Sequence, residues 1–360
     1  MSYDKNLPYN DLPLLLPSEN VWEEIGIYKK LKDARATLAE LKGRMHIIPN
    51  PLMLINTLVI QEAKDSSTIE NIFTTNDKLY KAFSSNLHNI DPATKEVLRY
   101  REALWAAFSG LHKKEDFSKE LAVKIFKTLT QKEEEIRISQ VYIGNSQQVI
   151  YTPPEPGKIL FDKLNNWFDI AIDSSIEIDP LIKMAILHYQ FEAIHPFSDG
   201  NGRTGRILNV IYLCLEKLID IPVIYISNYI LNNKSDYYRL IREVTEAGIW
   251  KNWIIYMLEA IRITSILTLK KVNAIYDYYI ETIEKIKKEA NDIYSHELIE
   301  VIFSQPYCKI AILEQKKIAS RNTASKYLKR LEDIGILSSE VVGKEKLFKN
   351  VSLIKILSDS

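Results

Sequence analysis

The dipeptide Asp-Pro occurs at Asp91-Pro92 and again at Asp179-Pro180, and a helical pattern of apolar residues follows each time. An aspartate cap followed by proline in the first helical position is a strong helix start, because the missing N–H of proline is not needed there. We expect helices over 92–111 and 180–192. The same spacing of apolar residues predicts a mainly α fold, with further helices over 21–43, 51–70, 118–130, 206–220, 235–247 and 250–290.

The segment IRISQVYIGNSQQVIYTPPEP departs from this helical pattern. Apolar and polar residues alternate along Ile136–Ile143, turn-forming residues follow at Gly144-Asn145-Ser146, and Val149–Tyr151 resumes the alternation before a run of prolines. This pattern predicts a β-hairpin within a helical protein.

The last part of the chain, residues 295–360, has a different pattern. It predicts a helix, a short helix, a third helix and two strands around Gly343, which is typical of a winged helix-turn-helix domain. Its basic residues favour contact with DNA, although a solvated lysine-rich face or a surface for dimerisation or target docking fits equally well. These basic residues are Lys326, Lys329, Arg330, Lys344, Lys346 and Lys349.

The overall composition excludes some classes of protein. There are 47 Lys and Arg against 47 Asp and Glu, so the zero net charge does not indicate a nucleic-acid or membrane partner. Cys214 and Cys308 have no metal-binding spacing and do not suggest a disulfide framework. No signal peptide and no uncharged apolar run of eighteen residues is recognised in the sequence, so we expect a cytoplasmic protein without a membrane span.

The segment HPFSDGNGRTGR, His195 to Arg206, concentrates chemically active residues. Its glycines satisfy the dinucleotide pattern G-x-G-x-x-G, but a predicted helix precedes them where that pattern needs a strand. Gly200 and Gly202 allow close approach of the backbone to a ligand, and a helix beginning near Asn201–Arg203 directs free N–H groups at an anion.

The charged residues of this segment complete a predicted reaction site. Arg203 and Arg206 lie three residues apart and can reach the same polyphosphate. Asp199 suggests a hard cation such as Mg²⁺, and His195 exchanges protons near neutral pH. The segment therefore predicts transfer of a phosphate-linked group to a nucleophile.

These twelve residues match the motif H-P-F-x-D-G-N-G-R-x-x-R, and the chain resembles the Fic family. That resemblance implies a helical core that transfers AMP from ATP, with Mg²⁺, to a hydroxyl group of a protein. It implies that His195 is the general base and that Phe197 anchors the loop. It also implies that Asp199 holds Mg²⁺, that Gly200, Asn201 and Gly202 bind the α- and β-phosphates, that Arg203 contacts the β-phosphate, that Arg206 contacts the γ-phosphate, and that Thr204 and Gly205 fill the variable positions.

The resemblance assigns a function to the hairpin and to one tyrosine. The hairpin becomes a flap that holds the target as an added strand, with Val141, Ile143 and Gly144 at its edge, where Ile143 and Gly144 also approach ATP. Tyr237, in NNKSDYYRLI, resembles the residue that lines the nucleoside site.

The hexapeptide SSTIEN, Ser66 to Asn71, resembles the inhibitory helix of the family. The resemblance implies a bidentate pair between Glu70 and Arg206 that occupies the place of the γ-phosphate. Read without the resemblance, the hexapeptide is a helix end with Asn71 as a left-handed cap. We call residues 66–71 the inhibitory segment.

Three parts are therefore expected: an N-terminal helical region with the inhibitory segment (1–110), a Fic core (111–275) and a winged helix-turn-helix (285–360). The expected function is that of an auto-inhibited protein adenylyltransferase whose target is another protein or the chain itself. A nucleotide-sensing DNA-binding regulator and a transferase of another phospho-group are the alternatives, and homo-oligomer formation is left open. The intact His195 favours an enzyme, because a nucleotide sensor needs no base.

Overall fold

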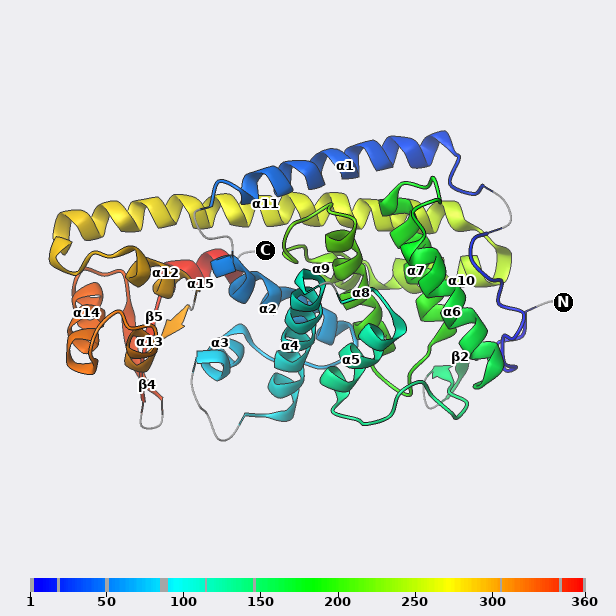
Figure 1. The fold of residues 1–360 in the computed structure, drawn as a ribbon, viewed down its shortest axis with the longest axis horizontal. Coiled ribbons are helices and arrows are strands. Elements are labelled where there is room, and N and C mark those ends of the chain that lie inside the picture. The colour runs from blue at the N-terminus through cyan, green and yellow to red at the C-terminus, as the bar shows by residue number, and fades with distance from the viewer. Residues whose placement is uncertain are drawn as a thin grey trace.

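The computed structural model describes residues 3–17, 20–48, 52–84, 90–113, 115–144, 147–304, 306–342 and 345–358, with backbone only for 52–57 and 84. The fold is mainly helical, as the sequence predicts (Figure 1). The helices are α1 (Ile25–Met45), α2 (Leu52–Ile69), α3 (Asn76–Ser84), α4 (Pro92–His112), α5 (Lys119–Thr130), α6 (Lys158–Ile172), α7 (Pro180–Ile194), α8 (Asn201–Leu215), α9 (Ile226–Asn232), α10 (Lys234–Ala247), α11 (Trp250–Glu289), α12 (His296–Ser304), α13 (Ile310–Gln315), α14 (Arg321–Asp333) and α15 (Val351–Ser358). The strands are β1 (Ile143–Gly144), β2 (Val149–Tyr151), β3 (Tyr307–Cys308), β4 (Ser338–Val342) and β5 (Glu345–Lys349).

Both Asp-Pro signals start helices as predicted. The Asp91 carboxylate accepts a hydrogen bond from the Thr94 N–H at 3.0 Å, and the Asp179 carboxylate accepts one from the Leu181 N–H at 2.9 Å. The sequence analysis did not predict α3, α6, α9 or α15. The range 206–220 given for the helix after the motif begins too late, but the start expected near Asn201–Arg203 is confirmed, because α8 begins at Asn201 and the motif forms its first turns.

Helix α7 is a buried core helix, and it leads directly into the motif. Every residue of α7 except Pro180 and Glu192 is buried. The helix is therefore enclosed on every side, as expected of a core helix. Helix α8 packs against it, and α6 and α11 cover other sides. The loop between α7 and α8 is therefore held between two buried helices.

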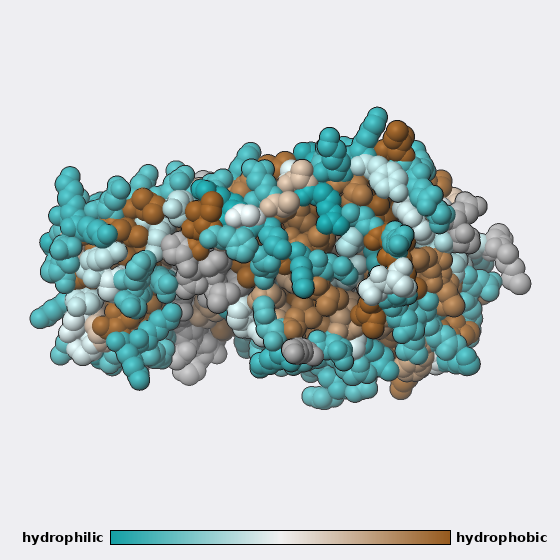
Figure 2. Space-filling model, turned by 45° about the horizontal axis from the view of Figure 1, so that its top comes forward, coloured by the Kyte–Doolittle hydropathy of each residue, from teal (hydrophilic) through white to brown (hydrophobic). Residues whose placement is uncertain are grey.

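Helices α1 and α11 lie side by side along the upper edge of the molecule (Figure 1). Among the helices of the described ranges, α11 is long and apolar enough to cross a membrane by length and composition alone. However, 56 % of its most apolar window is buried inside the protein. Hydrophilic and hydrophobic side chains alternate over the visible face on this side (Figure 2).

The predicted hairpin is shorter than expected. Ile143 and Gly144 pair with Tyr151 and Val149 in an antiparallel ladder, but the strand predicted over 136–143 is wrong for its first seven residues. Arg137 explains the difference: its N–H donates to the Pro196 carbonyl at 3.0 Å, so this segment bonds to the motif loop instead of a strand. Asn145 and Ser146, the predicted turn, lie outside the described residues.

The C-terminal part follows the predicted order of helix, short helix, helix and two strands, at the left of Figure 1. Strand β3, which the sequence did not predict, joins β5 and β4 in a three-stranded antiparallel sheet. Helix α12 packs against α2, and the Tyr307 hydroxyl donates to Asp77 Oδ1 at 2.5 Å. The part therefore rests on the helix that carries the inhibitory segment. Gly343 and Lys344 lie outside the described residues.

Candidate active site

The motif loop runs between two left-handed residues, His195 at the end of α7 (φ 50°) and Gly200 before α8 (φ 66°). Phe197 is fully buried and stacks on Phe126 with ring centroids 4.5 Å apart. The amide side chain of Asn201 bonds both backbone groups of Phe197, at 2.8 and 2.9 Å. The Asn201 side chain therefore fixes the loop, and only its backbone N–H is available for a phosphate.

A cavity of about 430 Å³ opens beside this loop. Seven of the residues predicted from the sequence line it, which brings together segments far apart in the chain. They are Glu70, Ile143, Gly144, His195, Gly202, Arg206 and Tyr237. The other predicted ATP-binding residues do not line this cavity; they are Asp199, Gly200, Asn201, Arg203, Thr204 and Gly205.

The imidazole of His195 is in the protonation state that a general base requires. Burial lowers the pKa of its imidazole to about 4, so the ring is neutral at physiological pH. Its Nδ1 lies 3.3 Å from the Glu192 carbonyl oxygen. A hydrogen bond from Nδ1 to this carbonyl orients the ring and leaves the lone pair on Nε2 to accept a proton.

Arg206 lines the cavity, and its side chain is 2 % exposed. Its Nη2 donates to Glu70 Oε1 at 2.7 Å and to the Ser66 carbonyl at 3.0 Å. Its Nε donates to Ser66 Oγ at 2.8 Å. The structure thus contains the ion pair predicted between Glu70 and Arg206. The bidentate form is wrong, because Ser66 takes the second edge of the guanidinium.

The Glu70 carboxylate lies over the first turn of α8. A Cβ atom at Gly202 would overlap Glu70 Oε1, so this close approach requires glycine. Burial would raise the pKa of Glu70, but the charge and hydrogen bond of Arg206 outweigh it and hold the pKa below its usual range. The carboxylate therefore occupies a helix N-terminus that suits a phosphate. Asn71 is left-handed (φ 63°), as the alternative reading of the hexapeptide expected.

Arg203 has a partner that the sequence analysis missed. Its buried guanidinium pairs through Nη1 with Glu96 of α4. Its Nε is buried and has no hydrogen-bond partner within the described part of the chain. Thr204 is fully buried and contributes to the core of α8. The pairing of Arg203 could not be read from sequence spacing, since 107 positions separate the two residues.

Part of the cavity lining is aromatic. Tyr237 is almost fully buried, and its hydroxyl is hydrogen-bonded to His188 Nε2 at 2.9 Å. Tyr238 also lines the cavity, as does Glu192, and neither was predicted. Burial raises the pKa of Glu192 to about 7, Arg206 opposes that rise, and Glu70 adds to it. The position of Glu192, one turn before His195, was the available signal.

The predicted flap (residues 141–151) borders the cavity through β1 and β2. Ile143, Gly144 and Ile150 are among the cavity-lining residues. Val141 precedes β1 and belongs to no ladder in the described part of the hairpin. Its carbonyl oxygen accepts a hydrogen bond from Gln140 Nε2 at 3.1 Å, whereas its N–H takes part in no hydrogen bond recorded among the described residues. The N–H is therefore the group that an added segment would use.

Asp199 is the predicted metal ligand. Its carboxylate is exposed, and Oδ1 accepts a hydrogen bond from the Gly200 N–H at 2.7 Å. In the described ranges, no three His, Cys, Asp or Glu residues come together as a metal-binding group. A single exposed carboxylate beside an anion site suits Mg²⁺, which is usually held by one or two carboxylates together with phosphates and water.

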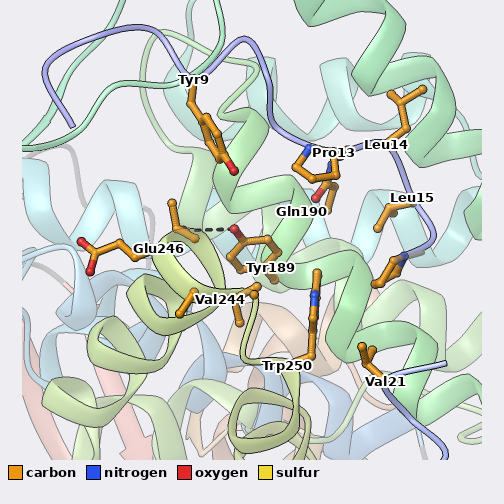
Figure 3. A pocket seen from close by; sticks show the side chains of 14 residues that line it. Tyr9, Pro13, Leu14, Leu15, Val21, Tyr189, Gln190, Val244, Glu246 and Trp250 are labelled. Atoms are coloured by element: carbon orange, nitrogen blue, oxygen red, sulfur yellow. Dashed lines mark hydrogen bonds between the residues drawn. The ribbon is translucent and has the colours of Figure 1, made fainter. Parts of the chain in front are cut away.

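A second cavity of about 440 Å³ lies between the N-terminal segment, α7 and the end of α10 (Figure 3). The N-terminal segment forms one wall, with Tyr9 and Pro13, and faces Tyr189 and Trp250. Thr245, which is hydrogen-bonded to the Tyr189 hydroxyl at 3.0 Å, lines both cavities. None of the residues predicted for the site lines the second cavity.

Three protein families match successive parts of the sequence. The N-terminal domain of the Fic/DOC family matches residues 28–109, and the Fic/DOC family itself matches residues 113–213. The C-terminal domain of SoFic-like protein adenylyltransferases matches residues 279–353. The matches leave out little except the N-terminal arm and the segment that contains α9, α10 and the first part of α11.

Curated relatives are similar over the motif region. Protein adenylyltransferase fic-1 of Caenorhabditis elegans is 42 % identical over 74 residues, which is 20 % of this chain and 13 % of the relative. Protein adenylyltransferase Fic of Drosophila willistoni is 40 % identical over 76 residues, 21 % of this chain and 14 % of the relative. The chain thus spans only a small part of the length of these relatives.

Solved structures share the fold at low identity. A Fic family protein from Desulfovibrio desulfuricans has a TM-score of 0.57 and 19 % identity, covering 89 % of this chain and 95 % of that one. Fic-1 from C. elegans has a TM-score of 0.53 and 17 % identity, covering 67 % and 71 %. With the complete motif, the helical core around it and the three family matches, the chain belongs to the Fic/DOC family.

Proposed function

We propose that the protein is an auto-inhibited protein adenylyltransferase, which transfers AMP from ATP to a hydroxyl group of a target protein. The observation that carries this proposal is the position of Glu70. Its carboxylate pairs with Arg206 over the N-terminus of α8, in the same cavity as the neutral His195. The names of the similar proteins support the same activity.

In the proposed reaction, the target hydroxyl oxygen attacks the α-phosphorus of ATP. A new P–O bond forms, the bond to the bridging oxygen of the β-phosphate breaks, and diphosphate leaves. His195 takes the proton of the hydroxyl, for which its depressed pKa keeps it in the base form. The rest of catalysis is positioning and stabilisation of charge.

The phosphates would bind where the Glu70 carboxylate now lies. The first turn of α8, from Asn201 to Arg203, supplies backbone N–H groups, and Arg206 supplies a charged fork. Asp199 would hold Mg²⁺, which neutralises phosphate charge. Glu70 excludes the γ-phosphate from Arg206 as long as the ion pair persists, and this is the proposed basis of inhibition.

The target would bind along the flap by main-chain hydrogen bonds. Val141 lies just before β1, outside the ladder, and Ile143 lies next to the nucleotide cavity. Such β-augmentation recognises an extended segment through its main chain and depends little on the sequence of the target.

The proposal is tested with radiolabelled ATP and Mg²⁺. Wild type, Glu70→Gly and the double variant Glu70→Gly/His195→Ala are incubated separately with α-labelled and γ-labelled ATP. We expect label on protein from α-labelled ATP with Glu70→Gly, much less with wild type and none with the double variant. Transfer of the γ-label instead would identify a phosphotransferase. No transfer of either label, with ATP binding intact, would contradict the proposal.

The basic residues of the C-terminal part give weaker support to the DNA-binding alternative. Lys329 pairs with Glu332 and Asp333, Lys346 also reaches Glu332 at 3.6 Å, and Lys349 pairs with Glu340. Charges neutralised within the domain contribute little to phosphate binding. Tight, steeply salt-dependent binding to duplex DNA would favour the alternative.

A further inference from the structure

The Glu192 side chain lines the cavity beside the motif. It projects from the last turn of α7, three residues before His195. Its Oε1 is buried without a hydrogen-bond partner in the described structure. A buried polar atom left unsatisfied is costly, and native structures contain few of them. An acceptor of this kind inside a ligand cavity indicates that the ligand supplies the donor.

The neighbouring groups do not satisfy this carboxylate. The recorded hydrogen bonds of Arg206 go to Ser66 and Glu70. His188, one turn earlier on α7, is hydrogen-bonded to Tyr237, and burial lowers the pKa of His188 to about 3, so its ring is uncharged. His188 Nδ1 is also buried without a hydrogen-bond partner in the described structure, and it lies near Glu192 Oε1 over Gly205. No recorded hydrogen bond joins these two atoms, so the acceptor on Glu192 is still unsatisfied.

The location of Glu192 is fixed by Gly205. A Cβ atom on Gly205 would come within 2.9 Å of Glu192 Oε1, so the glycine lets the carboxylate lie directly against α8. The cavity lining includes Arg206 and Gly202, which suit phosphates, and the aromatic side chains of Tyr237 and Tyr238. Glu192 lines the same cavity as these two groups of residues, and its contact with Gly205 places it beside the residue that precedes Arg206.

The chemistry of Glu192 selects its partner. In its ionised form Glu192 repels phosphate, which disfavours the polyphosphate as its ligand. In any nucleotide the ribose lies between the phosphates and the base, and its two hydroxyls are uncharged donors that carboxylates bind in other nucleotide sites. We propose that Glu192 binds the ribose hydroxyls of the nucleotide and makes this site selective for ribonucleotides. This inference rests on the proposed function, because it assumes that ATP occupies the cavity.

The test compares the dissociation constants of ATP, 2′-deoxy-ATP and 3′-deoxy-ATP, measured by calorimetry in the Glu70→Gly background. With Glu192 intact, we expect at least one deoxy analogue to bind about tenfold to a hundredfold more weakly than ATP. Glu192→Ala should weaken ATP by a similar factor and remove the discrimination. Glu192→Gln keeps an acceptor oxygen and should retain most of it. Glu246→Ala, an exposed glutamate of the second cavity, is the matched control and should change nothing.

The outcomes separate the inference from the function on which it rests. If Glu70→Gly binds no ATP, the proposed function fails as well. If Glu70→Gly binds ATP, 2′-deoxy-ATP and 3′-deoxy-ATP with equal dissociation constants, the proposed function stands and the role of Glu192 is refuted. If Glu192→Gln loses as much affinity as Glu192→Ala without any change in discrimination, Glu192 acts as a charge beside Arg206, which also overturns the inference. Melting temperatures of all variants establish that they are folded.

Discussion

Arg206 Nη2 and Glu70 Oε1 lie 2.7 Å apart in a site where the arginine side chain is 2 % exposed. A buried guanidinium left without a counter-charge is strongly destabilising, so Arg206 needs an anion at all times. Within the cavity, the Glu70 carboxylate fills that requirement from inside the chain. A phosphate of ATP competes with this carboxylate for Arg206. Binding of ATP in the productive position therefore requires that the phosphate replace Glu70 beside the guanidinium.

Replacement of Glu70 by glycine should raise the rate of AMP transfer at least tenfold. The variant removes the resident anion and frees both Arg206 and the first turn of α8 for the γ- and β-phosphates. The rate of labelling from α-labelled ATP measures the effect. Glu177→Gly, at an exposed glutamate before α7, is the matched control and should leave the rate unchanged. An unchanged rate in Glu70→Gly, with ATP bound, would refute the inhibitory role.

The pH profile of Glu70→Gly should show no loss of rate from His195 near pH 6.5. Burial lowers the pKa of this imidazole to about 4, so the base form predominates above that pH and is lost only as the pH falls through about 4. Initial rates between pH 5.5 and 7.5 test this. His195→Ala in the same background should reduce the rate by about 10²–10⁴-fold at every pH. An inflection near pH 6.5 that disappears with His195 would contradict the buried, neutral ring.

The features that sequence predicted correctly depend on local signals. The Asp-Pro helix starts and the left-handed Asn71 are set by neighbours in the chain, and the resemblance to a known motif brought Glu70 to Arg206. The features it missed depend on tertiary contacts. Glu96 meets Arg203 from a distant helix. Alternation over 136–142 could not reveal that Arg137 would bond to the motif loop and leave the segment without a strand partner.

Proline at Val141 should abolish modification of the target while leaving ATP affinity unchanged. Val141 lies just outside the β1–β2 ladder, so the proline removes an N–H that the target would use without breaking Ile143–Tyr151 pairing. Val141→Ala keeps the N–H and should retain modification, which separates the backbone from the side chain. Both variants are made in the Glu70→Gly background, and label transfer and ATP binding are measured. Normal label transfer by Val141→Pro would exclude augmentation at this position.

The stability of the protein should fall between pH 4.5 and 7 because of Glu62, on the helix that carries the inhibitory segment. This side chain is 1 % exposed, accepts hydrogen bonds from the Ser227 N–H at 3.1 Å and the Tyr100 hydroxyl at 3.2 Å, and has its pKa raised by burial to about 7.

Because the folded pKa of Glu62 lies above the unfolded value of 4.5, the stabilisation from its protonated form is fully present below pH 4.5. That stabilisation is lost as the pH rises through about 7, and the loss amounts to roughly 3 kcal/mol at most. Glu62→Gln cannot titrate. The difference in unfolding free energy between wild type and this variant should therefore shift against wild type as the pH increases from 4.5 to 8. Denaturant unfolding at a series of pH values measures it. A difference that stays constant over this range would show that the carboxyl titrates normally in the folded protein.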